Sequence, residues 1–317
     1  MRTITALFVG LGSIGTRHLK NLANLCADRG WTLQADALRS DLTRPLRPGA
    51  AELLHAQYTD LAAALAHYDM VFITNPTSLH AEALRQVKGR GEALFIEKPI
   101  FSAEQTGLAL DELLPAGQKA YVAAPMRWCG AMLALKDRLP ALHPYCARVI
   151  CSSYLPDWRP GVDYRTVYSA RKALGGGVTI DLIHEWDYLV ELFGVPEKLY
   201  NFKGTYSELE IDSDDLSVYI AKYPTLLAEV HLDYFGRGYR RSIELFCRDG
   251  SYLADFGAGT LTLPDGTVQH YEEDVNRRYE REMEYFVDYA LTGCGESCNP
   301  PALALKVLKL TLGENVQ

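Results

Sequence analysis

Two different patterns of hydrophobic and polar residues divide the chain. Up to about residue 125, short apolar runs rich in β-branched residues alternate with Ala- and Leu-rich segments of helical period. This alternation is typical of βαβ units in a parallel sheet. We therefore expect strands at residues 4–9, 32–38, 70–74, 93–97 and 120–123, and helices at residues 14–27, 61–66, 79–88 and 103–113.

From about Cys146 onward, strand-like runs follow one another through turn signals. The pairs Asp249-Gly250 and Asp265-Gly266 are residues that tight hairpin turns prefer. This half should form an antiparallel sheet, with one helix before it and two after it. The expected strands are residues 216–223, 226–235, 242–248, 252–256 and 260–263, and the expected helices are 178–193, about 275–291, and 301–311.

These patterns predict two domains of different fold class. Residues 1–124 should form a Rossmann-type, doubly wound parallel sheet, and residues 125–317 an α+β domain with an open, mainly antiparallel sheet. The C-terminal helices could pack back on the first domain.

Composition narrows the classes of function. With 317 residues, 48% of them hydrophobic, the chain can build two substantial cores. A net charge of −8 argues against nucleic acid as the main partner. No apolar stretch approaches the roughly 20 residues of a membrane helix, and the N-terminus reads as a strand and not as a secretory signal, so we expect a cytoplasmic protein without a membrane partner. The seven scattered cysteines favour free thiols over disulfides.

A glycine-rich turn follows the first expected strand. Gly10, Gly12 and Gly15 form a G-x-G-x-x-G pattern, with Ser13 and Ile14 at the start of the next helix. The first glycine permits a tight turn, the second lets a pyrophosphate approach the backbone, and the third allows close helix packing. The helix N-terminus adds N–H donors and a positive dipole end. The pattern favours dinucleotide binding over a merely structural turn.

The end of the second strand bears on the choice of cofactor. An acidic residue there would bind the ribose hydroxyls of NAD, whereas an Arg would accommodate the additional phosphate of NADP. The chain has Arg39 and Ser40 at this place. NADP is therefore favoured, although Asp36 or Asp41 leaves NAD open, and Arg39 could be an ordinary solvated side chain.

Three further motifs follow the glycine turn along the chain. They are Thr74-Asn75-Pro76 with His80, Glu97-Lys98-Pro99, and Gly175-Gly176-Gly177 followed by Asp181, His184 and Asp187. As a set, these motifs resemble the Gfo/Idh/MocA family of nicotinamide-dependent oxidoreductases. The resemblance implies an N-terminal Rossmann domain, a C-terminal domain that binds substrate, and homodimers or homotetramers built on its open sheet.

The resemblance also implies roles for particular residues. Lys98 would lie near the nicotinamide and the substrate, and His184 would be an acid/base or a substrate ligand, with Asp181 as a third catalytic group. Many family members place the His four residues after the Asp, whereas here His184 lies three residues after Asp181. His184 is therefore carried over more securely than Asp181.

The same resemblance extends the cofactor and substrate sites. Asn75 and Pro76 would border the nicotinamide ribose, and the remaining motif residues Thr74, His80 and Glu97 would join the cofactor site. Arg127-Trp128 resembles an Arg-aromatic pair of the family's substrate site, although Cys129-Gly130 replaces the proline often found next.

The residues themselves leave simpler interpretations open. Asp181, His184 and Asp187 share one sector of the expected helix, which could merely face water. Lys98 follows a strand at the edge where open α/β sheets bind ligands, but strand-end lysines are also often solvated. The corresponding reaction is reversible oxidation of a secondary alcohol to a ketone, with Lys98 or His184 taking the hydroxyl proton; it requires no metal.

A segment rich in aromatic and basic residues suggests the substrate. Aromatic faces pack on sugar rings, and arginines bind phosphates or carboxylates, so an acidic or nucleotide-linked sugar is indicated. A domain or subunit contact is the alternative. The residues are Tyr154, Trp158, Arg159, Tyr164 and Arg165.

The leading hypothesis is an NADP- or NAD-dependent sugar dehydrogenase or reductase. One rival is a glycosidase-like relative that retains its NAD. Another is a cofactor-binding regulator of the same fold without catalysis. The sequence leaves the sugar and the direction of reaction open.

Overall fold

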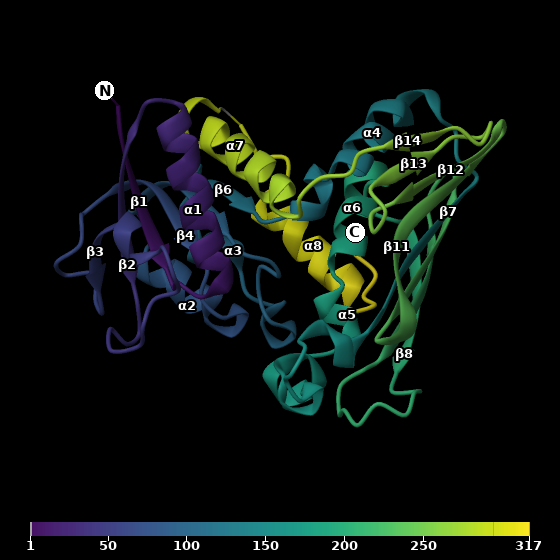
Figure 1. Cartoon of the computed structure of the whole chain (residues 1–317), viewed down its shortest axis with the longest axis horizontal. Coiled ribbons are helices and arrows are strands. Elements are labelled where there is room, and N and C mark those ends of the chain that lie inside the picture. The colour runs from purple at the N-terminus through teal and green to yellow at the C-terminus, as the bar shows by residue number, and fades with distance from the viewer. Residues whose placement is uncertain (1, 294, 317) are drawn as a thin grey trace. The chain divides into compact units, whose positions relative to one another are not determined.

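The computed structural model describes residues 2–293 and 295–316, which form two compact units (Figure 1). The first unit runs to residue 123 and takes in Tyr279–Leu305. The second comprises Ala124–Arg278 and the chain from Lys306 onward. Within the described ranges, no helix is both long and apolar enough to span a membrane.

The first unit contains a six-stranded parallel sheet in the order β3-β2-β1-β4-β5-β6. This is the strand order of a Rossmann fold, so the doubly wound prediction is confirmed. The order reverses between β1 and β4, where the carboxyl ends of the strands border a ligand crevice in such folds. The strands are β1 (Thr3–Val9), β2 (Thr32–Leu38), β3 (Leu54–Tyr58), β4 (Tyr68–Ile73), β5 (Gly91–Ile96) and β6 (Lys119–Val122).

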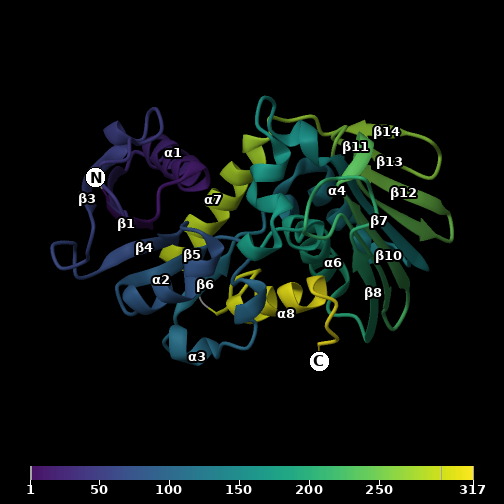
Figure 2. The same ribbon diagram turned by 90° about the horizontal axis from the view of Figure 1, so that it is seen from below.

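Helices cover both faces of this sheet (Figure 2). Helix α1 (Ser13–Asp28) and α7 (Asn276–Thr292), most of which belongs to this unit, lie on one face. Helices α2 (His80–Gln86) and α3 (Leu110–Leu113) lie on the other face. Aromatic side chains fill the core between the sheet and the helices α1 and α7. Among them, the ring centres of Phe8 and Phe72 stack 4.5 Å apart.

Two expected helices of this unit are wrong. Residues 61–66 form turns, because the Asp60 carboxylate accepts the Ala62 N–H at 2.7 Å and so competes with helical hydrogen bonds. Residues 103–113 form a 3₁₀ turn, Ala103–Gln105, and the separate α3. The capping box of Ser102 and Gln105 is present, but it starts only the short turn. The short edge strand β3 was not predicted; its residues alternate between partly buried and exposed side chains.

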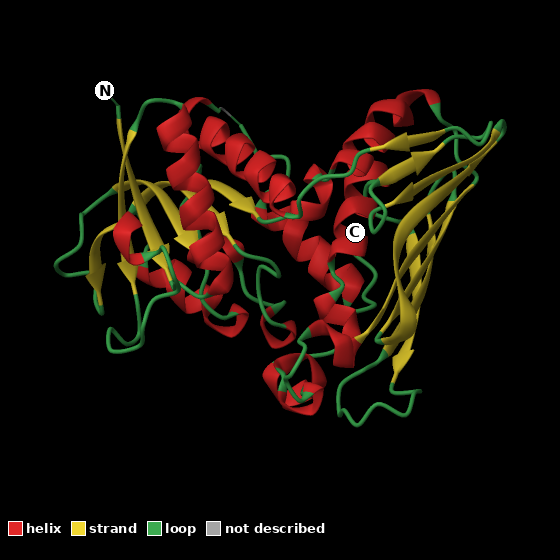
Figure 3. Cartoon of the chain, viewed as in Figure 1, coloured by secondary structure: helices red, strands yellow, loops and turns green. Residues whose placement is uncertain are grey.

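The second unit contains an eight-stranded sheet in the order β14-β13-β12-β11-β7-β10-β9-β8 (Figure 3, yellow). Its pairs are antiparallel except for β7 with β10, so the mainly antiparallel prediction is confirmed. Strands β7, β8 and β14 were not predicted. The strands are β7 (Cys146–Tyr154), β8 (Lys198–Gly204), β9 (Leu216–Lys222), β10 (Leu227–Asp233), β11 (Phe235–Cys247), β12 (Gly250–Asp255), β13 (Thr260–Thr262) and β14 (Val268–His270).

Helices lie against one face of this sheet. They are α4 (Gly130–Arg138), α5 (Val178–Asp181), α6 (His184–Phe193) and the end of α8 (Pro301–Thr311) (Figures 1 and 3). The strands accordingly alternate buried and exposed side chains: Val149 is buried against the helices, while Arg148 is exposed on the other face.

The single helix expected over residues 178–193 is wrong, because the chain leaves the helical conformation at Leu182 (ψ 36°). The two halves have different partners. Thr179 of α5 donates its backbone N–H to Asp214, whereas Glu185 of α6 binds Arg241. As a result Asp181 and His184 belong to different helices, and the interval between them does not define one helical face.

Candidate active site

The glycine turn connects β1 to α1 beside the end of β4. Gly10 has a φ of +82°, and a Cβ atom there would lie 2.7 Å from Asn75 Cα. A Cβ at Gly15 would lie 2.7 Å from Thr74 Oγ1. A Cβ at Gly12 would meet nothing within 4 Å. The outer two glycines thus permit close packing, and the middle one presents its backbone to open space.

The start of α1 has the features of an anion site. Gly12 is its N-cap, no side chain caps it, and its first turn, which includes Ser13 and Ile14, contains no acidic residue. The first N–H groups of the helix are therefore available to a ligand, and the positive end of its dipole is not neutralised. The open backbone at Gly12 and these donors fit the pyrophosphate of a dinucleotide.

A basic hollow lies beyond the end of β2. Arg39 donates from Nη1 to Gln57 Oε1 at 2.7 Å and from Nη2 to the Arg44 carbonyl at 2.5 Å. The side chain is thereby held along a hollow of about 380 Å³ that Arg44 and Arg47 also line. Ser40 follows Arg39 and is exposed. The hollow presents several guanidinium groups, which favour a phosphate.

The two acidic residues near β2 are engaged elsewhere. Asp36 is completely buried, where it accepts a hydrogen bond from Tyr68 Oη at 2.7 Å. Asp41 accepts the Thr43 hydroxyl at 2.6 Å, and this bond, with the Thr43 backbone N–H, lowers the pKa of the Asp41 carboxyl. Asp36 therefore cannot reach a ribose, and Arg39 occupies the place of the acidic residue that binds the ribose in NAD enzymes.

Lys98 follows β5 at the same edge of the sheet. It is half-buried, its Nζ has no hydrogen bond or salt bridge to a described residue, and its peptide bond to Pro99 is cis. Glu97 is buried and accepts the Lys98 backbone N–H at 3.0 Å. Burial opposes ionisation of Glu97, but the hydrogen bond and charge of His18, and then Lys98, lower the pKa of this carboxyl below its usual value. Glu97 is an anion at neutral pH beside the Lys98 side chain.

His80 is buried and connects two loops of the first unit instead of facing the ligand crevice. It is buried, with Nε2 3.0 Å from the Asn75 carbonyl and Nδ1 3.1 Å from the Ile100 carbonyl. Burial lowers the pKa of its imidazole. His80 therefore connects the loop after β4, with Asn75 and Pro76, to the loop after β5.

In the second unit, Asp181 is held by two tyrosines. The Tyr168 hydroxyl donates to Asp181 Oδ1, and the Tyr234 hydroxyl donates to Oδ2 at 2.6 Å. Asp181 is buried, and burial raises the pKa of both tyrosines. His184, half-buried, begins α6.

Arg127 and Asp187 form a buried ion pair. Arg127 donates from Nε to Asp187 Oδ2 at 3.0 Å and from Nη2 to Oδ1 at 2.7 Å. Its Nη1 donates to Glu191 at 2.5 Å, and Glu191 also binds Lys136. Burial raises the pKa of Asp187, although Arg127 opposes this shift. The guanidinium beside Trp128 is thus bound to protein carboxylates, and the interpretation that Asp181 and Asp187 face water is wrong.

The segment rich in aromatic and basic residues divides into bound and exposed side chains. Arg165 pairs with Asp163 and Glu210, and the Tyr164 hydroxyl accepts the Glu210 N–H at 3.1 Å. The Arg237 guanidinium lies 3.7 Å from the centre of the Tyr154 ring.

The exposed members lie close to each other along this segment. Trp158 is 39% exposed and donates from Nε1 to Ser153 Oγ at 3.0 Å. Arg159 is exposed and has no salt bridge to a described carboxylate. These two side chains remain open to a ligand.

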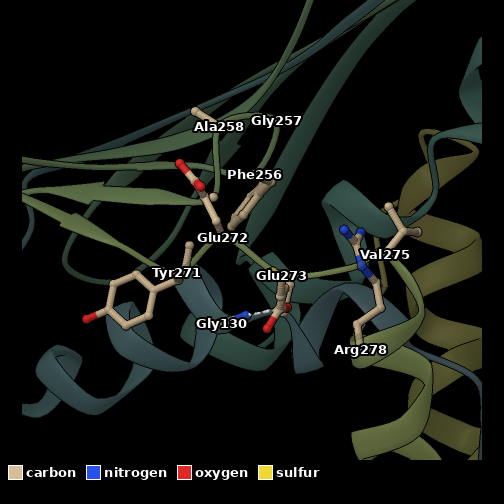
Figure 4. Close-up of a pocket in the computed structure, with 12 residues that line it drawn as sticks. Gly130, Phe256, Gly257, Ala258, Tyr271, Glu272, Glu273, Val275 and Arg278 are labelled. Carbon is tan, nitrogen blue, oxygen red and sulfur yellow. Dashed lines mark hydrogen bonds between the residues drawn. The ribbon is translucent and has the colours of Figure 1, made fainter.

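A separate hollow in the second unit is a poor candidate. It has a volume of about 140 Å³ and is lined by Phe256, Glu273 and Arg278, with the Gly130 N–H donating to Glu273 at 3.0 Å (Figure 4). Ligand pockets usually enclose about 300–1,000 Å³. None of the residues predicted for the site lines it. Within the described ranges, no group of three or more His, Cys, Asp or Glu is placed to hold a metal.

Sequence reasoning missed several partners in these sites. His18 lies one helical turn after Gly15 and is buried on the apolar face of α1. The only sequence signal for it was a polar residue on that apolar face. Gln57 lies on the unpredicted β3. Tyr234 contacts Asp181 across a large sequence separation, so no local pattern could have indicated it.

Comparison with known proteins agrees with this architecture. Residues 4–123 match the GFO_IDH_MocA family model, described as an oxidoreductase family with an NAD-binding Rossmann fold. Inositol 2-dehydrogenase of Rhizobium meliloti (strain 1021) is 26% identical over 200 residues, which cover 61% of this chain and only 56% of that enzyme.

Solved structures share the fold over nearly the whole chain. A levoglucosan dehydrogenase in complex with NADH and levoglucosan has a TM-score of 0.82 and 15% identity, covering 98% of this chain and 96% of that one. The WlbA dehydrogenase of Bordetella pertussis, in complex with NADH and UDP-GlcNAcA, has a TM-score of 0.75 and 17% identity, covering 98% and 95%. The N-terminal unit is thus similar to the NAD-binding Rossmann domain of the Gfo/Idh/MocA oxidoreductases, and the fold of the whole chain is shared with solved dehydrogenases.

Proposed function

We propose that the protein is an NADP(H)-dependent dehydrogenase or reductase acting on a secondary alcohol or ketone of a sugar or sugar derivative. The observation that carries this proposal is the combination, in one Rossmann unit, of an open glycine turn and a basic hollow after β2. Two of the proteins named above act on inositol or levoglucosan, and the third is seen in complex with a nucleotide-linked sugar. These ligands support the proposed substrate class.

The cofactor would be held by groups from successive parts of this unit. The first N–H groups of α1, together with Gly10, Gly12 and Gly15, suit the pyrophosphate. Arg39, fixed by Gln57, suits the additional phosphate of NADP, and the burial of Asp36 disfavours NAD.

When bound, the nicotinamide supplies a hydride acceptor or donor. Lys98 exchanges the proton of the substrate oxygen at its Nζ, and the ionised Glu97 beside it attracts this side chain. His184 is the second proposed acid/base or substrate ligand. Asp181, bound by two tyrosines, holds the substrate segment in place through Tyr168.

The substrate is proposed to carry a negative charge. Arg159 and Trp158 are the exposed basic and aromatic side chains of the segment, and they suit an acidic or nucleotide-linked sugar. Arg165 and Arg127 are already bound to carboxylates, which leaves Arg159 as the proposed anion ligand.

We also propose a homodimer or homotetramer built on the exposed face of the second unit's sheet. Phe202 is 71% exposed on edge strand β8, and Ile220, which is paired with Tyr200, extends the apolar surface to β9. Exposed apolar surface of this kind commonly marks a protein interface.

The test is an absorbance assay at the nicotinamide band with free, acidic and nucleotide-linked sugars and both cofactors, repeated with Lys98→Ala. We expect turnover that prefers NADP and that is lost in the variant. Release of a free sugar without net change in absorbance would indicate the glycosidase-like relative. Cofactor binding without turnover on any sugar would indicate a regulator, and a clear preference for NAD would reject the role of Arg39.

A further inference from the structure

A buried histidine lies directly behind the Glu97-Lys98 turn. His18, on the inner side of α1, has no exposed surface, and its Nε2 lies 2.6 Å from Glu97 Oε1. Its other ring nitrogen, Nδ1, is buried without a hydrogen-bond partner. A buried polar atom without a partner costs free energy, so its retention calls for a reason.

These contacts determine the form of His18. The Glu97 carboxylate accepts a hydrogen bond, so the proton lies on Nε2. The ring lies among Phe95, Phe72 and Tyr279, whose ring centres lie 4.7, 6.5 and 6.1 Å from that of His18. His18 therefore directs the N–H of its Nε2 at one carboxylate oxygen of Glu97.

Glu97 transmits this contact to Lys98. Its second oxygen, Oε2, accepts the Lys98 backbone N–H at 3.0 Å, so both carboxylate oxygens have one donor each. The carboxylate is buried, and these bonds offset part of the cost of keeping it charged. Its negative charge in turn attracts the Lys98 side chain.

Few other titratable groups face this cluster. His80 lies on the Glu97 side, with both nitrogens directed at the backbone carbonyls of Asn75 and Ile100. Tyr279 faces His18 from α7 and is covered in turn by the Arg17 guanidinium, 4.5 Å from the centre of its ring. Of these groups, only His18 donates to the Glu97 side chain.

We propose that His18 is a positioning residue for Lys98. By donating to Glu97, it holds this carboxylate in place, and so fixes the location and the reactivity of the Lys98 amine at the end of β5. The functional meaning rests on the proposed role of Lys98, but the arrangement can be tested without substrate or cofactor.

The test is competitive acetylation of the whole protein with trace acetic anhydride between pH 6 and pH 11, with labelling of the Lys98 peptide quantified by mass spectrometry. In His18→Phe the carboxylate loses its donor and no longer holds the Lys98 side chain in place, so the Lys98 amine should become more reactive. We expect labelling of Lys98 at pH 8 to rise about tenfold. Glu97→Gln should do the same.

Two further variants separate positioning from a general structural role. His18→Gln retains an N–H donor and should label Lys98 at the wild-type rate. The matched control His67→Gln changes an exposed histidine of the same unit and should have no effect. Wild-type labelling of Lys98 in His18→Phe would overturn the proposal. If that variant does not fold, unchanged labelling in Glu97→Gln would overturn it equally.

These outcomes do not depend on the proposed enzymatic function. If no sugar is turned over but labelling changes as expected, the proposed function fails and the positioning role stands. If turnover is found and labelling is unchanged, the reverse holds.

Discussion

Two candidate groups of the first unit are open to a ligand, whereas most candidate side chains of the second unit are bound to protein partners. The backbone at Gly12 faces open space, and Lys98 Nζ has no hydrogen bond or salt bridge to a described residue. In the second unit, Arg127, Arg165 and Asp181 all have partners of opposite charge or with donor hydroxyls. Groups whose hydrogen bonds are not already made within the protein can bind a ligand. Groups that are bound to protein partners stabilise the structure around the ligand site.

The largest effect should follow removal of the Lys98 amine. Lys98→Met should lower turnover about 10²–10⁴-fold, because a positioned proton-transfer group contributes that much, with cofactor affinity retained within a few fold. Initial rates at the nicotinamide band measure this. Lys88→Met, at an exposed lysine that binds the Glu112 carbonyl, is the control. Equal rates for the two variants would remove Lys98 from the reaction.

The next effect concerns stability in the second unit. Arg127→Met leaves Asp187 buried without a counter-charge and should lower the free energy of unfolding by about 3–5 kcal/mol. Arg165→Met removes exposed ion pairs and should cost less than about 1 kcal/mol. Urea denaturation of both variants makes the comparison. Similar small losses would contradict a stabilising role of the buried pair.

The choice of cofactor should depend on Arg39. Arg39→Ala should weaken NADPH binding about 10–100-fold, since a charge-assisted contact to phosphate contributes about 1.5–3 kcal/mol, and should leave NADH binding within about twofold. Fluorescence titration measures both affinities, with Arg85→Ala on α2 as the control. An equal loss for both cofactors would place Arg39 outside the phosphate site.

The smallest effect is the pH dependence of stability at Glu97. The pKa of this carboxyl is lowered in the folded chain, so its stabilising contribution is present above its unfolded pKa, near 4.5, and is lost as the pH falls through the folded value. The difference in unfolding free energy between the wild type and Glu97→Gln at pH 7 should shrink toward pH 3. Urea denaturation at both pH values checks this, and a difference independent of pH would contradict it.

The sequence predicted best where structure depends on neighbouring residues. Strand β2 was predicted with its observed bounds, and the glycine turn lies in one contiguous segment. The Asp249-Gly250 turn joins β11 to β12 as predicted, and the Asp265-Gly266 turn leads from β13 to β14, a strand that was not predicted. In each case the signal is a local backbone requirement.

Prediction failed where distant partners decide the structure. The helix expected over residues 178–193 breaks at Leu182 because its halves bind Asp214 and Arg241, neither of which is near in sequence. Arg127 matched a family motif, but its pairing with Asp187 spans 60 residues. Whether a polar residue is open to a ligand or satisfied within the protein cannot be read from periodicity.

The most direct measurement is a fluorescence titration of NADPH against the wild type and Gly12→Val, with circular dichroism to monitor the fold. Gly12 has an ordinary φ of −76°, and nothing lies within 4 Å of an added Cβ, so the variant should fold normally. We predict that the wild type binds NADPH and that the variant binds at least about 100-fold more weakly, because the valine methyl groups fill the space of the pyrophosphate. A wild type that does not bind NADPH, or a folded variant that binds it equally well, would contradict the assignment of this turn as the cofactor site.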